Sequence, residues 1–129
     1  MGPQPREVWF VRDSEVKLHS ENRTDKGNRP VLVVTSVDLA GSDIPMINVV
    51  PLTTSSEWDE LTYPVSRAYY KTFDGFNPET NSSAIIPLYQ PILKKHFADR
   101  CGILEADAYE AIRHTLCLKV VGYPDFDIP

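Results

Sequence analysis

The 129-residue sequence predicts a mainly β protein with one helix near its C-terminus. Short runs rich in Val, Ile and aromatic residues recur along the chain and are separated by turn signals. Five or six such runs are typical of a small, strongly bent antiparallel sheet or barrel. One later segment instead repeats apolar residues at helical spacing. At this length we expect a single domain, 1–129, with a core of about residues 5–122 and a short tail at 123–129.

The predicted strands of the first half are short and well separated. Residues 7–12 alternate weakly and contain Val, Trp and Phe, residues 31–36 are a nearly continuous apolar run, and residues 46–52 are a further apolar run. The polar stretch 13–28 predicts a long loop, which in a compact domain is often functional. Residues 37–45 predict a turn.

The second half combines further strands with an aromatic connection. Residues 61–67 predict a short strand interrupted by Pro64, and residues 83–89 predict a strand that continues through 90–93. Between them, residues 69–78 predict an elaborated loop. Its aromatic side chains either pack on the barrel or stack on nucleic-acid bases, and packing is the usual outcome for a single ring.

Residues 105–118 predict the helix. Its apolar side chains recur at i, i+3/i+4 and i+7, and its acidic residues gather near the start, where the helix dipole favours them. The predicted buried face comprises Ala108, Tyr109, Ile112, Thr115 and Leu116.

Charge and composition limit the possible functions. The formal net charge of −5 argues against a nonspecific nucleic-acid binder but allows an RNA enzyme with a local basic groove. No apolar run is long enough to span a membrane, and the N-terminus lacks the pattern of a secretory signal, so we expect a cytoplasmic protein without membrane contact. Cys101 and Cys117 lack metal-binding spacing, and we expect no metal or cofactor.

The segments 27–35 and 49–54 contain the strongest candidate site. Arg29 precedes the first apolar run and Thr53 follows the second. If the two runs pair as neighbouring strands, both side chains converge on one anionic group. The guanidinium fork matches phosphate bidentately, and the threonine hydroxyl adds one more hydrogen bond. This pair of side chains is typical of a minimal phosphodiester site.

The order of several segments resembles that of the MazF/PemK family of toxins from type II toxin–antitoxin pairs. The resemblance rests on residues 7–11, Arg29-Pro30 with its valine run, Pro51-Leu52-Thr53, Gln90-Pro91 and residues 102–104 before the helix. It implies an SH3-like barrel of the MazF/PemK/CcdB type. It further implies a sequence-selective, metal-independent endoribonuclease that acts on mRNA, which is single-stranded RNA. It implies a cognate antitoxin as partner and a homodimer, for which Ile85-Ile86 and the terminal helix could supply an apolar face.

The resemblance also assigns roles. RNA cleavage must deprotonate the 2′-OH, stabilise charge on phosphorus and protonate the 5′ leaving oxygen. Arg29 would stabilise that charge and is a candidate proton donor to the leaving oxygen, while Thr53 would hold the phosphate or orient the 2′-OH. The candidate substrate-binding residues are Lys26, Thr54, Ser55 and Gln90. If strand alternation extended to Thr54, its side chain would face away from that of Thr53.

The general base is left open by the sequence. The PemK branch has an arginine and an aspartate ahead of its Gln-Pro pair, where this chain has Pro87 and Tyr89. The remaining candidates, each of which could equally be an ordinary surface residue, are His19, Glu57, Asp59 and Glu60. Two alternatives therefore stay open: a non-catalytic toxin on the same fold, like the gyrase-poisoning CcdB proteins, and a catalytically lapsed binding protein.

Overall fold

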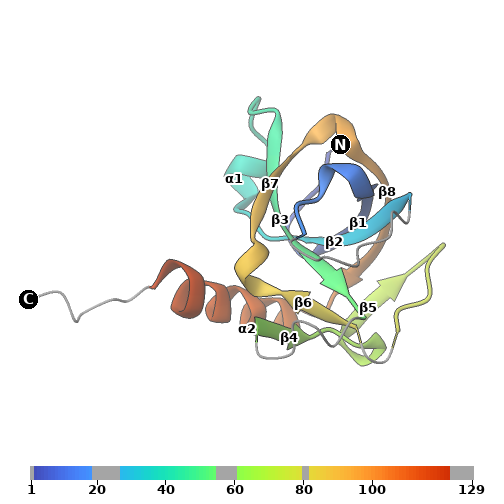
Figure 1. Ribbon diagram of the computed structural model, residues 1–129, viewed down its shortest axis with the longest axis vertical. Coiled ribbons are helices and arrows are strands. Elements are labelled where there is room, and N and C mark those ends of the chain that lie inside the picture. Colours follow the sequence, from blue (N-terminus) through green and yellow to red (C-terminus); the bar gives the residue numbers. More distant parts are fainter. Residues whose placement is uncertain (1, 19–26, 55–60, 80–81, 123–129) are drawn as a thin grey trace, which may run out of the picture.

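The computed structural model describes residues 2–18, 27–54, 61–79 and 82–122. Within these residues, eight strands form one antiparallel sheet that curves into a small barrel (Figure 1). The strands are β1 (Glu7–Arg12), β2 (Asn28–Val33), β3 (Met46–Thr53), β4 (Thr62–Pro64), β5 (Tyr70–Phe73), β6 (Ser83–Ile85), β7 (Gln90–Leu93) and β8 (Phe97–Leu104).

Strand order brings both halves of the candidate site to the middle of the sheet. The order is β4-β6-β3-β2-β1-β8-β5, and β7 pairs with β3. In the β1–β2 pair Val11 lies opposite Arg29, and in the β2–β3 pair Val31 lies opposite Pro51. Strand β3 is therefore bordered by β2 on one side and by β6 and β7 on the other.

The helix α2 (Ala106–Leu116) lies near β4 and β6, beside one end of the barrel (Figure 1). Its Tyr109, Ile112 and Leu116 are buried in the same core cluster as Val65 and Ala84. Burial of such side chains contributes roughly 1.5–3 kcal/mol each. A π-helical turn, Cys117–Val121, continues α2 and ends at Gly122, whose φ of 81° is left-handed. No helix in the described ranges is long and apolar enough to cross a membrane.

The predicted fold class is confirmed, and several element boundaries are corrected. Strand β1 has the predicted bounds, whereas residues 37–45 contain a short helix, α1 (Val37–Ala40), because Ser36 Oγ accepts a hydrogen bond from Leu39 N–H at 3.1 Å. The predicted strand 83–93 is divided into β6 and β7 by a 3-10 turn, Ile86–Leu88. This turn contains Pro87, which suits the start of a helical turn.

Two strands were not predicted. Strand β5 lies in the expected loop at 69–78, and β8 begins in the polar sequence Phe97–Arg100. Both strands have faces exposed to solvent, so few of their residues are apolar and the pattern that predicts a strand is weak. Of the aromatic residues between 69 and 78, Tyr70 is buried and Phe76 half-buried, while Tyr69 and Phe73 are exposed.

Ile85 and Ile86 do not form an exposed apolar face. They are 0% and 3% exposed within the chain's own core, because β6 lies between β3 and β4 and the following turn packs on α2. The expectation that these two residues supply a dimer surface is wrong.

Candidate functional site

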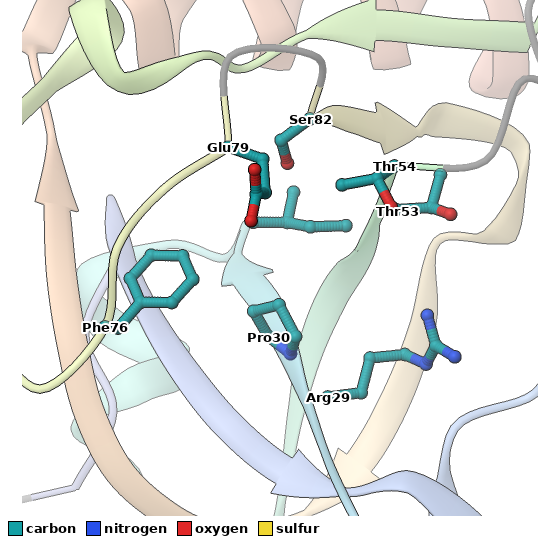
Figure 2. Close-up of a pocket in the computed structure, with 8 residues that line it drawn as sticks. Arg29, Pro30, Thr53, Thr54, Phe76, Glu79 and Ser82 are labelled. Atoms are coloured by element: carbon teal, nitrogen blue, oxygen red, sulfur yellow. The ribbon is translucent and has the colours of Figure 1, made fainter. Parts of the chain in front are cut away.

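The ends of β2 and β3 frame a small open pocket of about 80 Å³ (Figure 2). That space suits a phosphate group rather than a whole nucleotide. The lining side chains come from β2, from the end of β3 and from the segment that precedes β6: Arg29, Pro30, Leu52, Thr53, Thr54, Phe76, Glu79 and Ser82.

The sheet register brings Arg29 and Thr53 together. Val31 pairs with Pro51 and Leu32 with Val50, so the same register extended toward the start of β2 places Arg29 opposite Thr53. Directly opposed side chains share one face of the sheet. The prediction that the two runs pair as neighbouring strands is confirmed, and both side chains line one pocket.

A buried carboxylate, Asp13, holds the guanidinium of Arg29. Arg29 Nε–H donates to Asp13 Oδ1 at 2.7 Å, and the two residues are 5% and 0% exposed. Asp13 begins the 3-10 turn Asp13–Glu15 directly after β1, and Val11, two positions before it, lies opposite Arg29 in the sheet. Asp13 N–H also donates to Gly27 O at 2.9 Å, which closes the base of the loop between β1 and β2.

This ion pair fixes the direction in which Arg29 presents its remaining donors. The bond to Asp13 uses Nε–H, and the two terminal amino groups make no hydrogen bond to any residue that the structure describes. Those groups can grip two oxygens of one phosphate in the planar arrangement that guanidinium favours. Because the pair is buried, the orientation is set before substrate arrives, as electrostatic stabilisation of a transition state requires.

Thr54 lines the same pocket as Thr53, so the expected alternation does not separate them. Strand β3 ends at Thr53, and beyond the strand end the chain no longer follows strand alternation. Ser82, which is 9% exposed, lines the pocket from the segment before β6, and its carbonyl accepts from Val65 N–H at 2.9 Å.

Phe76 and Glu79 are pocket residues that sequence reasoning missed. Phe76 forms one wall, packing edge-on against Phe10 with ring centroids 5.6 Å apart. Glu79 is exposed and brings a carboxylate to the pocket. Phe76 lies in the segment 69–78 that was expected to be a loop, and Glu79 directly follows that segment. No sequence pattern would have identified them without the strand pairing.

Gln90 does not line this pocket. Its side-chain amide accepts from Lys17 N–H at 2.7 Å and donates to Lys17 O at 3.0 Å and Leu88 O at 2.9 Å. These bonds occupy both ends of the amide, so Gln90 holds the start of the long loop against β7. In this structure, Gln90 therefore makes backbone hydrogen bonds, and the pocket in which we expected it to contact substrate does not include it. The candidates Lys26, Ser55, His19, Glu57, Asp59 and Glu60 lie outside the described residues.

Tyr89 and Pro87 are also not among the residues that line this pocket. Burial raises the pKa of the Tyr89 phenol, a shift only partly opposed by a hydrogen bond with Asn48, so the hydroxyl stays protonated near neutral pH. Tyr89 therefore cannot replace a carboxylate base. Among the described residues there is no group of three or more His, Cys, Asp or Glu side chains that could hold a metal ion.

Solved structures share this arrangement of elements. An endoribonuclease in complex with its cognate antitoxin from a mycobacterial species is 15% identical, with a TM-score of 0.63 over 95% of this chain and 96% of that one. MazF in a MazE–MazF complex from Deinococcus radiodurans is 13% identical, with a TM-score of 0.63 over 91% and 94%. The Mycobacterium tuberculosis toxin MazF-mt6 is 18% identical, with a TM-score of 0.60 over 87% and 93%.

No protein-family model and no curated protein matches the sequence. The likeness to these structures extends over nearly the whole of both chains, so it concerns the complete barrel and its helix rather than a shared fragment. This chain has the fold of the MazF proteins.

Proposed function

We propose that this protein is a MazF-type toxin that cleaves single-stranded mRNA as a metal-independent, sequence-selective endoribonuclease. The observation that carries the proposal is the pocket that Arg29, fixed by Asp13, lines together with Thr53. The neighbouring fold supports it, because the mycobacterial structure is described as an endoribonuclease. An mRNA substrate places the protein in the cytoplasm.

In this mechanism the pocket receives the scissile phosphodiester. The terminal amino groups of Arg29 donate charge-assisted hydrogen bonds to the phosphate oxygens, which gain negative charge as the 2′-oxygen attacks. The Thr53 hydroxyl holds the phosphate or orients the 2′-OH. The products are a 2′,3′-cyclic phosphate and a 5′-hydroxyl end. A retained, preorganised pair at the pocket favours an active enzyme over a lapsed or CcdB-like binding protein.

The RNA chain extends beyond a pocket of this size. Residues 69–73, which include β5, lie nearby, since the ring centroids of Tyr70 and the pocket residue Phe76 are 5.9 Å apart. Tyr69 and Phe73 are 38% and 42% exposed, and exposed Lys71 lies between them. Aromatic rings and cations interleaved in this way stack on bases and neutralise phosphates. We propose that bases flanking the cleaved bond contact this strand.

Purified chain incubated with a long RNA is expected to yield fragments with 5′-hydroxyl ends at a restricted set of sequences. Thr53→Ala should cleave at the same sites more slowly, by about tenfold, because a neutral hydrogen bond contributes about 0.5–1.5 kcal/mol. Mapping of 5′-hydroxyl ends, with circular dichroism to verify folding, measures both. An inactive parent chain would favour the non-catalytic alternatives, and a Thr53→Ala variant at the parent's rate would remove Thr53 from the site.

We further propose a cognate antitoxin that covers Arg29 and the loop between β1 and β2. The mycobacterial neighbour was solved with its cognate antitoxin, and an exposed phosphate site can be blocked by an acidic segment that folds on binding. Adding the antitoxin to the cleavage assay should abolish the 5′-hydroxyl ends. If addition of the antitoxin left hydrogen exchange unchanged at residues 13–18 and 27–28, the antitoxin would bind elsewhere.

The chain is also proposed to form a homodimer. With Ile85 and Ile86 buried, the apolar side chains available are those after α2, where Leu118, Val120 and Val121 are 42%, 40% and 65% exposed. Exposed apolar residues grouped in this way favour an interface. Light scattering should give about twice the chain mass of 14.6 kDa, and Val121→Glu should reduce it toward the monomer. A monomeric parent across working concentrations would contradict the proposal.

A further inference from the structure

We propose that Glu79 is the general base that deprotonates the attacking 2′-OH. This inference rests on the proposed ribonuclease function and supplies the group that the sequence left unassigned. In the close-up, the Glu79 side chain enters the pocket from the rim across from Arg29, beside Ser82 and Phe76 (Figure 2). It is the one carboxylate among the described residues that line this pocket.

The segment that carries Glu79 is held in place although Glu79 itself is exposed. On its N-terminal side, the Phe76 ring packs against Phe10 and lies 5.9 Å from Tyr70 between ring centroids. Asn77 Oδ1 accepts from Arg67 Nη2 at 2.7 Å, and Pro78 is buried.

The chain is also anchored after Glu79. Ser82 N–H donates to Glu79 O at 3.4 Å, and Ser82 O in turn accepts from Val65 N–H at 2.9 Å. Contacts on both sides fix the backbone from which the carboxylate projects. A base must be held within hydrogen-bond reach of the proton that it abstracts, and these contacts limit the movement of the backbone that carries Glu79.

The Glu79 carboxylate is not engaged in a structural bond. Within the described ranges it forms no hydrogen bond or ion pair, and the ion pair of Arg29 is made with Asp13 instead. A carboxylate facing a phosphate pocket opposes binding by like-charge repulsion, so it disfavours a purely phosphate-binding role. The same carboxylate suits proton abstraction, because a carboxylate oxygen without a hydrogen-bond partner can accept a proton.

In the proposed reaction, Arg29 and Glu79 have separate roles in an in-line displacement. The 2′-oxygen forms a bond to phosphorus as the bond from phosphorus to the 5′-oxygen breaks, and the attacking and leaving oxygens lie on opposite sides of phosphorus. The 2′-OH proton passes to Glu79 and then to solvent, and the leaving 5′-oxygen takes a proton from water. Arg29, across the pocket, stabilises the charge that develops between them.

Glu79→Gln tests the assignment, because it keeps the size of the side chain and removes the base. Single-turnover cleavage of a fixed RNA is expected to fall by about 10²–10³, within the range for a positioned general base. The acidic limb of the pH–rate profile should disappear in Glu79→Gln and persist in Glu79→Asp at reduced rate. The matched control is Asp74→Asn, which removes one exposed carboxylate of the same connecting region outside this pocket.

The outcomes separate the two proposals. If the parent cleaves RNA and Glu79→Gln cleaves at the parent's rate with the same pH profile, the base lies elsewhere and the proposed ribonuclease stands. If Glu79→Gln and Asp74→Asn slow the reaction equally, the effect is one of charge, and the assignment is overturned. If the parent cleaves no RNA, both proposals fail. A selective loss in Glu79→Gln, with an unchanged circular dichroism spectrum, supports the base.

Discussion

Arg29→Lys is expected to slow RNA cleavage by about 10²–10³ while the protein stays folded, because lysine keeps the charge but loses the planar fork. Lysine can still face Asp13, but it then has no second, fixed pair of donors for the phosphate. The measurement is a single-turnover cleavage time course, accompanied by a urea unfolding curve. Arg100→Lys is the matched control, since Arg100 pairs with Glu7 at 3.1 Å outside the pocket and its side chain is 54% exposed.

The more obvious variant, Arg29→Ala, would be difficult to interpret. Arg29 is half of a buried ion pair. Its removal leaves Asp13 as an uncompensated buried charge, so lost activity and lost stability would coincide. Cleavage by Arg29→Lys at the parent's rate would show that the guanidinium geometry is not used, and the candidate site would have to be abandoned.

Asp13→Ala is expected to lower the free energy of unfolding by about 3–5 kcal/mol, the usual cost of leaving one partner of a buried pair unpaired. Arg29 would remain buried with its positive charge unmatched. Urea unfolding followed by circular dichroism measures the change. The control is Glu110→Ala: Glu110 pairs with Arg113 at 2.7 Å, but their side chains are 57% and 52% exposed, so no measurable loss is expected.

A double variant separates the two roles of this pair. Asp13→Leu combined with Arg29→Met replaces both charges by apolar groups of similar size, and such replacements are often neutral or stabilising. It should recover most of the stability lost in Asp13→Ala without recovering cleavage. An unfolding midpoint in Asp13→Ala equal to that of the parent would mean that the pair contributes nothing to the fold, contrary to its burial.

The sequence could predict those parts of the site that belong to strands. The β-rich runs locate β2 and β3, and one paired register is enough to bring Arg29 to Thr53. Asp13 was missed because its position depends on the β1–β2 register and on the bond to Gly27 O, and neither is visible as a local pattern. A polar residue just after a strand gives the same signal whether it is buried or solvated.

Glu79 and Gln90 are two further residues whose roles could not be predicted from the sequence: the first was missed as a pocket residue, and the second was expected to bind substrate. Glu79 is remote from Arg29 in sequence and lies in a turn-rich stretch, so its pocket position arises from tertiary packing of Phe76. Gln90 belongs to a Gln-Pro pair that suggested function by resemblance, yet both its amide oxygen and its amide nitrogen are hydrogen-bonded to backbone. The hydrogen-bond partners of a polar side chain show whether its role is structural or functional. Those partners depend on the fold and cannot be inferred from residue type.

The pairing of Arg29 with Asp13 also affects how RNA reaches the pocket. The two charges cancel at long range, and the whole chain carries a formal net charge of −5, so a distant polyanion meets net repulsion. If the protein binds RNA as proposed, we expect few condensed counterions to be released and little affinity to be gained by that route. Discrimination among RNA sequences then depends on contacts made within a few ångströms, and a strand that cannot form them dissociates quickly. If the proposed function is right, the protein spends little time on RNA that it does not cut.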